Sequence, residues 1–208
     1  EEANIGEVIV AAEDQEIVDD VRKNGGQAII TNNYHKTGTD RIYEAFLRFD
    51  NSKIDLIINL QGDEPLMNVD DIKHLNNQMI KNKSNLGTLA STILDKSLYE
   101  NKSVVKVTTK ESLTNVNFPE AVGFSREILD QDKKIYHHLG IYCYQKETLK
   151  EFVSCKQSFD EQKYKLEQLR ALENNIKINV ALAKTSPIGV DTKEDFLAIK
   201  KIMEYKLK

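Results

Sequence analysis

Two acidic turns of this sequence have the residue types and positions of a site for a hard metal cation. Gly62-Asp63-Glu64-Pro65 follows the apolar run at 53–61, and Asp191 follows a strand-like run at 176–183. In an open α/β sheet, ligands bind beyond the carboxyl ends of the strands, where both acids are expected. Mg²⁺ takes few protein carboxylates when waters and substrate phosphates complete its shell. The pattern therefore predicts a magnesium site formed by Asp63 and Asp191.

A simpler explanation exists for the first turn, because Gly and Asp are common in turns that need no ligand. Asp191 favours the metal site, since Thr192 can cap the following helix and leaves Asp191 available. The run at 53–61 is apolar enough for a central strand, so we expect the Asp63 carboxylate to be partly desolvated. No His and Cys cluster offers zinc a site, which favours the hard cation.

Composition limits the functions that are open to the chain. Its 208 residues carry 29 Lys+Arg against 33 Asp+Glu, a net charge of −4 without a long run of one sign. Non-specific binding to nucleic acid or to a membrane surface is therefore not expected. No apolar run reaches the length of a membrane span. Cys143 and Cys155 lack metal-type spacing and are expected to be reduced thiols of a cytoplasmic protein.

The elements expected before residue 81 alternate between strand and helix. Apolar runs at 7–12, 27–31 and 53–61 predict strands, and periodic segments follow each of them. The predicted helices lie at 14–26, 37–50 and 68–80; Thr39 or Asp40 caps the second and Asn68 the third. Such alternation predicts a parallel sheet that is covered by helices on both faces.

The rest of the chain breaks this alternation and then returns to it. Four strand-like runs without a convincing helix between them predict an antiparallel extension, at 86–94, 103–110, 121–126 and 138–145. Helices are predicted at 146–155 and 164–175, a strand at 176–183, and a last helix in which Thr192 and Asp195 have capping-box spacing. The predicted fold is a single three-layer, Rossmann-like α/β domain over residues 1–208, with a mixed, mainly parallel sheet.

Four motifs, taken together, resemble a known family. They are HKTGTDRIYEAF at 35–46, NLQGDEPLM at 59–67, HHLGIYCYQ at 137–145 with LEQLRALE at 166–173, and IGVDTKEDF at 188–196. Their order and approximate spacing are similar to those of the 3-deoxy-manno-octulosonate cytidylyltransferases, the CMP-KDO synthetases, over essentially the whole chain.

The resemblance implies a fold of the nucleotide-diphospho-sugar transferase type and a cytoplasmic, homodimeric, Mg²⁺-dependent enzyme. The anomeric hydroxyl of the acidic sugar KDO attacks the α-phosphorus of CTP, so that CMP-KDO forms for lipopolysaccharide synthesis and pyrophosphate leaves. Such a displacement depends on positioning and on neutralised phosphate charge. The strand-rich region 87–146 is expected to supply sugar contacts and the dimer interface.

By the same resemblance, Asp63 and Asp191 are the Mg²⁺ ligands, and Gln61 lies near nucleotide and sugar. The nucleotide loop, residues 37–41, reads cytosine through Thr37, Gly38, Thr39 and Arg41. The alternative for the nucleotide loop is an ordinary helix N-terminus with Thr39 as cap and Arg41 in solvent.

The KDO pocket needs a guanidinium and several polar groups. The resemblance assigns it Arg126, His138, Tyr142, Glu167 and Gln168, where His138 and Tyr142 share one strand face. The alternatives are a surface ion pair for Arg126, packed or rim positions for His138 and Tyr142, and, from periodicity alone, solvated positions for Glu167 and Gln168.

The remaining histidines, His35, His74 and His137, are expected at the surface or in structural positions. Two departures from the family are present: the sequence lacks its first strand and basic, glycine-containing phosphate loop, and the segment between Arg126 and His137 is short. We expect the polypeptide itself to carry the missing residues.

Three rival functions remain open. One is a related synthetase of the CMP-sialic acid type, and another is a non-catalytic protein that binds nucleotide or sugar. The third is a structural dimerisation module, which leaves Asp63 and Asp191 without a role.

Overall fold

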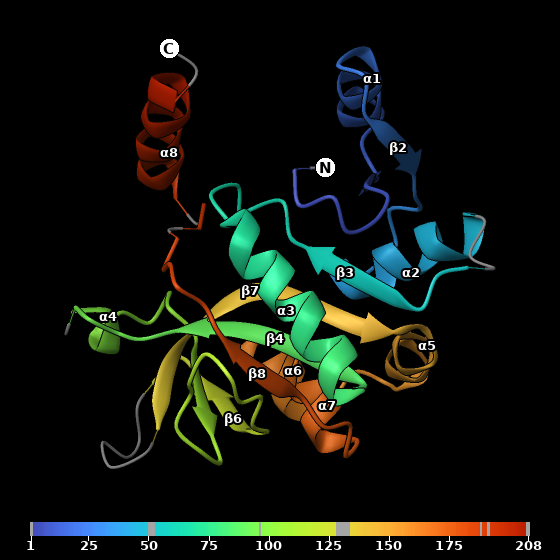
Figure 1. Ribbon diagram of the computed structural model, residues 1–208. Coiled ribbons are helices and arrows are strands. Elements are labelled where there is room, and N and C mark those ends of the chain that lie inside the picture. The colour runs from blue at the N-terminus through green and yellow to red at the C-terminus, as the bar shows by residue number, and fades with distance from the viewer. Residues whose placement is uncertain are drawn as a thin grey trace.

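A six-stranded mixed sheet organises the part of the chain described by the computed structural model, which is residues 2–49, 53–95, 97–127, 134–187, 189–190 and 192–206 (Figure 1). In chain order the elements are β1 (Ile9–Ala12), α1 (Gln15–Lys23), β2 (Gln27–Ile30), α2 (Gly38–Arg48), β3 (Leu56–Leu60), α3 (Val69–Asn82), β4 (Leu86–Ser91), α4 (Ser97–Glu100), β5 (Lys106–Thr109), β6 (Ala121–Ser125), β7 (Ile135–Gln145), α5 (Lys146–Ser154), α6 (Phe159–Tyr164), α7 (Leu169–Glu173), β8 (Asn179–Leu182) and α8 (Lys193–Lys206).

The sheet is built around β7. One edge of β7 pairs with β4, while β3 and β5 share the other edge, β3 along residues 141–145 and β5 along 135–137. The pairings give β3, β4, β5 and β8 one direction and β6 and β7 the opposite direction. The predicted mixed sheet with most strands in one direction is confirmed, as is the antiparallel extension through β5, β6 and β7.

Alternate side chains of β7 enter two separate cores, one on each face of the sheet. Tyr142 and Tyr144 pack with α5, α7 and the inner side of α2, whereas Ile141 and Cys143 pack beneath α3. This is the three-layer arrangement expected from a strand that is buried on both sides. Both cysteines are free thiols, and burial raises the pKa of Cys143 to about 12.

The first strand pair is separate from this sheet, which corrects the prediction of one continuous parallel sheet through the first three strands. β1 and β2 pair in parallel as a two-stranded sheet with their own small core around Val18, while β3 pairs antiparallel with β7. Figure 1 shows the β1–α1–β2 unit standing above the sheet, opposite α8. Within the described residues β1 and β3 belong to different sheets and do not pair with each other.

Local signals placed some helix ends correctly and others wrongly. Asn68 caps α3, and the Thr192–Asp195 capping box begins α8, as predicted. Thr37, not Thr39 or Asp40, caps α2 and accepts from Asp40 N. The helix predicted at 164–175 is shorter in the structure, where α7 begins only at Leu169, because Lys165 adopts the left-handed conformation at φ 53° and ends a separate helix, α6, at Tyr164. The short α4 was not predicted.

Candidate active site

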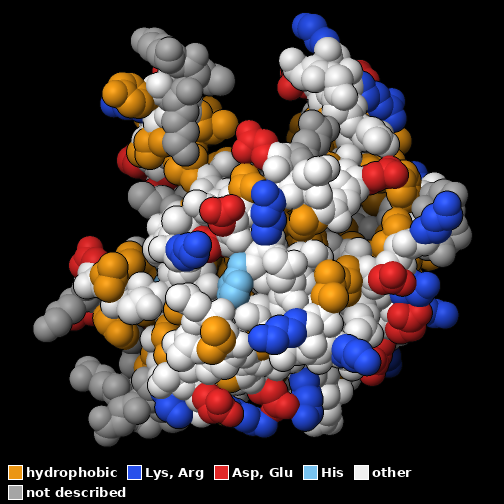
Figure 2. Space-filling view, in the orientation of Figure 1, with side chains coloured by type: hydrophobic (Ala, Val, Ile, Leu, Met, Phe, Trp, Pro, Cys, Tyr) orange, Lys and Arg blue, Asp and Glu red, His pale blue; other side chains and the backbone are white. Residues whose placement is uncertain are grey.

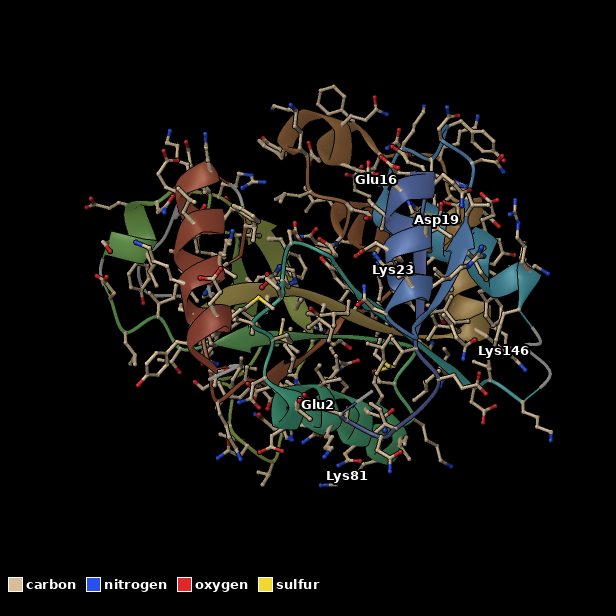
Figure 3. All side chains as sticks on the ribbon, turned by 90° about the horizontal axis from the view of Figure 1, so that it is seen from above. Glu2, Glu16, Asp19, Lys23, Lys81 and Lys146 are labelled. Atoms are coloured by element: carbon tan, nitrogen blue, oxygen red, sulfur yellow. The ribbon has the colours of Figure 1, made fainter. Side chains whose placement is uncertain are left out.

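A large cleft of about 2720 Å³ opens where the carboxyl end of β3, the start of α2, the middle of β7 and the α6–α7 junction meet. Residues of β1 and of the segment 186–195 form its other walls. In the space-filling view, α8 and the β1–α1–β2 unit rise on either side of the body of the molecule and leave a notch between them (Figure 2). From above, α1, with its exposed Glu16, Asp19 and Lys23, and α8 flank the strands, with α3 at one end (Figure 3).

The GDEP turn fills a break in the pairing of β7. β3 leaves the sheet at Leu60, opposite Ile141, and β5 begins only opposite His137. In this break Glu64 Oε1 accepts from the Gly140 main-chain nitrogen at 3.3 Å. A Cβ atom at Gly140 would lie 3.3 Å from Glu64 Oε1 and 3.4 Å from Gln61 Oε1, so the turn uses the space that a side chain would take. Glu64 therefore closes a strand edge, while Gln61 faces the cleft.

Asp63 lines the cleft and its side chain is exposed, which corrects the expected desolvation. The turn carries Asp63 out of the strand, so water reaches the carboxylate despite the apolar run before it. Val190 N donates to the Asp63 carbonyl at 2.8 Å, which brings the IGVDT motif against the GDEP turn. Asp191 lies outside the described residues. Among those described, no group of three or more His, Cys, Asp and Glu side chains is placed to hold a metal ion.

Asp71 fixes the segment that leads to Val190. Its carboxylate is 1% exposed and accepts from Lys184 N at 2.9 Å, Thr185 N at 3.2 Å and Thr185 Oγ1 at 2.7 Å. Asp71 lies in the first turn of α3, directly after the GDEP turn. One buried acid thus links the two segments that carry the predicted metal ligands, a role that the sequence did not indicate.

The nucleotide loop lines the cleft through Thr37, Gly38 and Arg41. Thr39 does not line the cleft: it is fully buried, 3.4 Å from Tyr144 Oη, and accepts from Asn59 Nδ2 at 3.3 Å. Arg41 donates to Thr31 Oγ1 at 2.7 Å and pairs with Glu13, so it is held rather than solvated. A Cβ atom at Gly38 would lie 3.9 Å from its nearest heavy atom, which leaves open space beside the backbone.

His138 and Tyr142 lie on one face of β7, as predicted, with ring centroids 5.5 Å apart. Between Thr88 and Leu89, β4 advances one residue while β7 advances from Tyr142 to Leu139. Two extra residues therefore bulge from β7, and an even number preserves the alternation of faces. Both side chains are almost fully buried and line the inner end of the cleft.

The His138 ring is neutral. Burial, with a smaller effect from neighbouring His137, lowers the pKa of His138 to about 3. The Thr88 hydroxyl donates to the Ile141 carbonyl at 2.7 Å and lies 3.0 Å from His138 Nε2. Because the Thr88 hydroxyl proton is donated to Ile141, the Thr88 oxygen accepts a hydrogen bond from His138 Nε2–H. His138 Nδ1 therefore carries no proton and can accept a hydrogen bond.

Arg126 supplies positive charge at the opposite wall of the cleft. Its Nη1 donates to the carbonyl oxygens of Lys102 at 3.1 Å and Ser103 at 2.9 Å. Lys106 Nζ lies behind it and donates to the Arg126 carbonyl at 2.9 Å. Burial and the charge of Arg126 lower the pKa of Lys106. Lys106 does not line the cleft, so the positive charge that this wall offers to an anionic ligand is that of Arg126.

Glu167 and Gln168 lie between α6 and α7 and line the cleft, so the solvated positions suggested by periodicity are wrong. Gln168 is 6% exposed. Burial raises the pKa of Glu167, and the Thr39 and Thr37 hydroxyls partly oppose this rise. Within the described residues Glu167 Oε1 is buried without a hydrogen bond of normal geometry. A polar ligand group is therefore the natural partner for this oxygen.

Two of the three histidines set aside from the sequence are structural. His35 pairs with Glu44, and His74 is half-buried in α3. His137, however, lines the cleft and contacts Ser186 Oγ through Nδ1 at 2.8 Å, and burial lowers its pKa. Sequence reasoning missed His137 because it faces away from His138 on the strand, while the cleft wraps around the strand edge.

Comparisons with known proteins agree with this geometry. A family model described as cytidylyltransferase matches residues 1–178. A 3-deoxy-manno-octulosonate cytidylyltransferase of Bartonella tribocorum is 39% identical over 97% of this chain and 83% of its own length. The enzyme of the same name from Paramagnetospirillum magneticum is 36% identical over 93% of this chain and 79% of its own length. The solved structure of a CMP:2-keto-3-deoxy-manno-octonic acid synthetase complexed with CTP is 30% identical, with a TM-score of 0.85 over 98% of this chain and 83% of that chain.

Proposed function

The chain belongs to the cytidylyltransferase family, and from this premise we propose that it transfers CMP from CTP to the anomeric hydroxyl of KDO, giving CMP-KDO and pyrophosphate. One observation carries the proposal. Four motifs that are far apart in the sequence contribute residues to a single cleft, through Gly38, Gln61, Tyr142, Glu167 and Val190. The names of the relatives and the CTP complex of the similar structure supply the two substrates.

The side chains of the cleft suit a displacement at phosphorus that works by positioning. The KDO hydroxyl oxygen forms a bond to the α-phosphorus as the bond to pyrophosphate breaks, and no covalent enzyme intermediate is needed. Arg126, rather than His138, binds the KDO carboxylate, because the neutral His138 ring offers no charge. His138 Nδ1 and Glu167 Oε1 accept from sugar hydroxyls, and Tyr142 closes the inner wall.

Mg²⁺ is the metal that this donor set fits. Asp63 is an exposed carboxylate in the cleft, and the segment of Asp191 lies against it through Val190, so the expected ligands are hard carboxylate oxygens. Asp63 and Asp191 would hold the ion with the triphosphate. Bound there, Mg²⁺ neutralises phosphate charge and lowers the pKa of the attacking hydroxyl.

A sialic-acid synthetase is not favoured, because the similar enzymes are named for the octulosonate sugar. A homodimer that uses the strand-rich region 87–146 is part of the proposal; it is supported by the exposed apolar side chains of Val116 and Val122 and is tested by mass in solution. A cytoplasmic site of action is also proposed, and the free thiols support it. No helix within the described residues has the length and apolarity to cross a membrane.

The Arg126→Ala variant tests the sugar pocket. Loss of the guanidinium should raise KM for KDO by about tenfold or more, with KM for CTP nearly unchanged, because a charge-assisted hydrogen bond contributes about 1.5–3 kcal/mol. Steady-state kinetics with each substrate varied gives both constants. Lys110→Ala, which removes an exposed cation outside the cleft, is the matched control. Equal increases in the two KM values for Arg126→Ala would move Arg126 out of the sugar pocket.

A further inference from the structure

Arg170 is a buried cation with no place in the proposed chemistry. It lies in α7 and is 1% exposed, the largest of the fully buried side chains. Its guanidinium lies over the Phe152 ring at 4.6 Å and does not line the cleft. A charge in this setting needs partners that are fixed in geometry, because removing it from water is costly.

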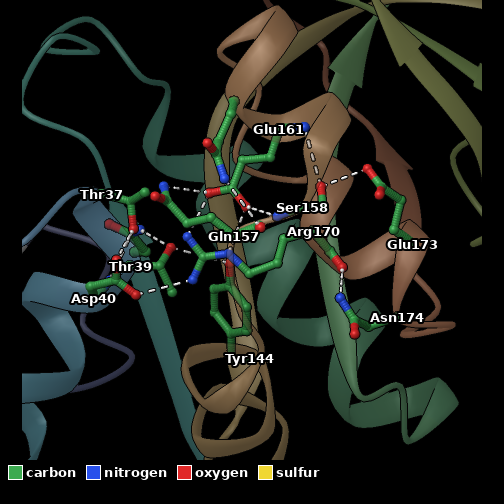
Figure 4. Close-up of polar contacts among 12 residues, drawn as sticks. Thr37, Thr39, Asp40, Tyr144, Gln157, Ser158, Glu161, Arg170, Glu173 and Asn174 are labelled. Carbon is green, nitrogen blue, oxygen red and sulfur yellow. Dashed lines mark hydrogen bonds and ion pairs between the residues drawn. The ribbon is translucent and has the colours of Figure 1, made fainter.

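Two acids from distant parts of the chain meet at Arg170 (Figure 4). Nε and Nη2 bind both carboxylate oxygens of Glu161 at 2.9 Å and 2.6 Å. Nη1 donates to Asp40 Oδ1 at 3.1 Å across 130 positions of sequence. Such a two-pronged contact leaves the planar guanidinium a single orientation, and the remaining nitrogen points at Asp40.

Each acid is tied to a different wall of the cleft. Asp40 Oδ2 accepts from the Thr37 hydroxyl at 2.9 Å, and Thr37 caps α2. Glu161 accepts from Ser158 N in the capping box of α6 and from Gln157 Nε2. Glu167 and Gln168 lie between α6 and α7, only a few residues from Arg170. Arg170 thus connects the nucleotide loop with the α6–α7 wall, which carries Glu167 and Gln168, although Arg170 itself does not line the cleft.

We propose that Arg170 is a positioning residue that sets base specificity by holding the nucleotide loop, through Asp40, at a fixed position against the α6–α7 wall. The proposal rests on the proposed function. If the nucleotide loop reads cytosine with Thr37 and the backbone at Gly38, a small shift of the helix start changes which pyrimidine edge fits. Glu161 orients Arg170, so loss of its charge should weaken the fold and also lower specificity, but by less than loss of Asp40, because Arg170 can still donate to Asp40.

The test is the ratio of kcat/KM for CTP to kcat/KM for UTP, measured on the full-length protein with KDO. Asp40→Asn removes the charge that Arg170 binds and keeps the size of the side chain. Arg170→Lys keeps a charge but cannot bind two carboxylates in this geometry. Glu161→Gln breaks the other half of the cluster. Glu120→Gln, whose acid pairs with Lys110 and Lys177 away from the cleft, controls for loss of an acid.

We expect Asp40→Asn to lower the CTP/UTP ratio by about tenfold, the scale of one charge-assisted hydrogen bond. Glu161→Gln should lower the melting temperature and lower the ratio by less than Asp40→Asn does, and Glu120→Gln should change neither. A wild-type ratio in Asp40→Asn would overturn the proposal, as would an equal fall in Glu120→Gln, which would assign the effect to the loss of any acid rather than to the Arg170 contact. If Arg170→Lys does not fold, Asp40→Asn still decides. Failure of the proposed function itself would be distinct, because the wild-type enzyme would then use neither nucleotide.

Discussion

The neutral state of His138 predicts a particular dependence of stability on pH. In the folded protein burial lowers the pKa of His138 to about 3, whereas an unfolded chain returns it to its ordinary value of 6.5. Between these two values the unfolded state binds the proton and the folded state does not. The free energy of unfolding therefore falls as pH falls below 6.5. Above pH 6.5 His138 is neutral in both states, and the stability that depends on its neutral form is fully present.

The size of this effect follows from the two pKa values. At pH 5 the unfolded side chain lies about 1.5 pH units below its pKa, and each unit contributes about 1.4 kcal/mol. The folded side chain remains neutral at this pH. Protonation of His138 alone should thus remove about 2 kcal/mol of stability between pH 7 and pH 5.

The assay is urea unfolding of the wild type and of His138→Gln at pH 7, 6 and 5. Glutamine keeps an N–H donor for Thr88 and does not titrate, so the difference between the two curves isolates His138. His137, whose pKa burial also lowers, is present in both proteins and cancels. Parallel loss of stability in the two proteins would refute the assignment of a buried, neutral ring.

Three further substitutions test separate parts of the structure. Asp63→Asn should abolish KDO-dependent turnover and leave the melting temperature within about 1 °C of wild type, because the side chain is exposed; turnover like that of the exposed control Asp70→Asn would remove Asp63 from the metal site. Gly87→Ala should lower the free energy of unfolding by about 1–3 kcal/mol in denaturant, since its Cβ would lie 2.7 Å from both Met79 Sδ and Phe118 Cζ. Gly123→Ala is the control, because its Cβ would have no heavy atom within 4 Å and should cost almost no stability. Equal losses in the two variants would contradict the packing at Gly87. Asp71→Ala should lower stability by about 3 kcal/mol, because it removes three hydrogen bonds between a buried carboxylate and Lys184 and Thr185. Asp70→Ala should cost less than about 1 kcal/mol, and similar values for the two variants would refute the buried link.

The features that depend only on residues close together in the chain, such as helix caps and strand faces, could be predicted from the sequence. The caps at Asn68 and at Thr192 with Asp195 depend on side chains and main-chain groups that are neighbours along the chain. The strand face shared by His138 and Tyr142 was also predictable, although only because the bulge in β7 adds an even number of residues.

The parts that were missed depend on contacts across the fold or on one unusual backbone conformation. Leu166 and Leu169 have helical spacing, but the left-handed conformation at Lys165 separates α6 from α7 and turns Glu167 and Gln168 into the cleft. No local pattern indicates that Arg170 meets Asp40, since their pairing requires the complete fold. The exposure of Asp63 likewise depends on the turn that carries it away from its strand.

Pyrophosphate release from CTP and Mg²⁺ by the full-length polypeptide, measured with and without KDO, decides whether the proposed reaction takes place. We predict release that requires KDO, is lost with a chelator, and is accompanied by CMP-KDO in equal amount. Release that is independent of KDO, or no release from a folded protein of verified mass, would contradict the proposed cytidylyltransferase reaction.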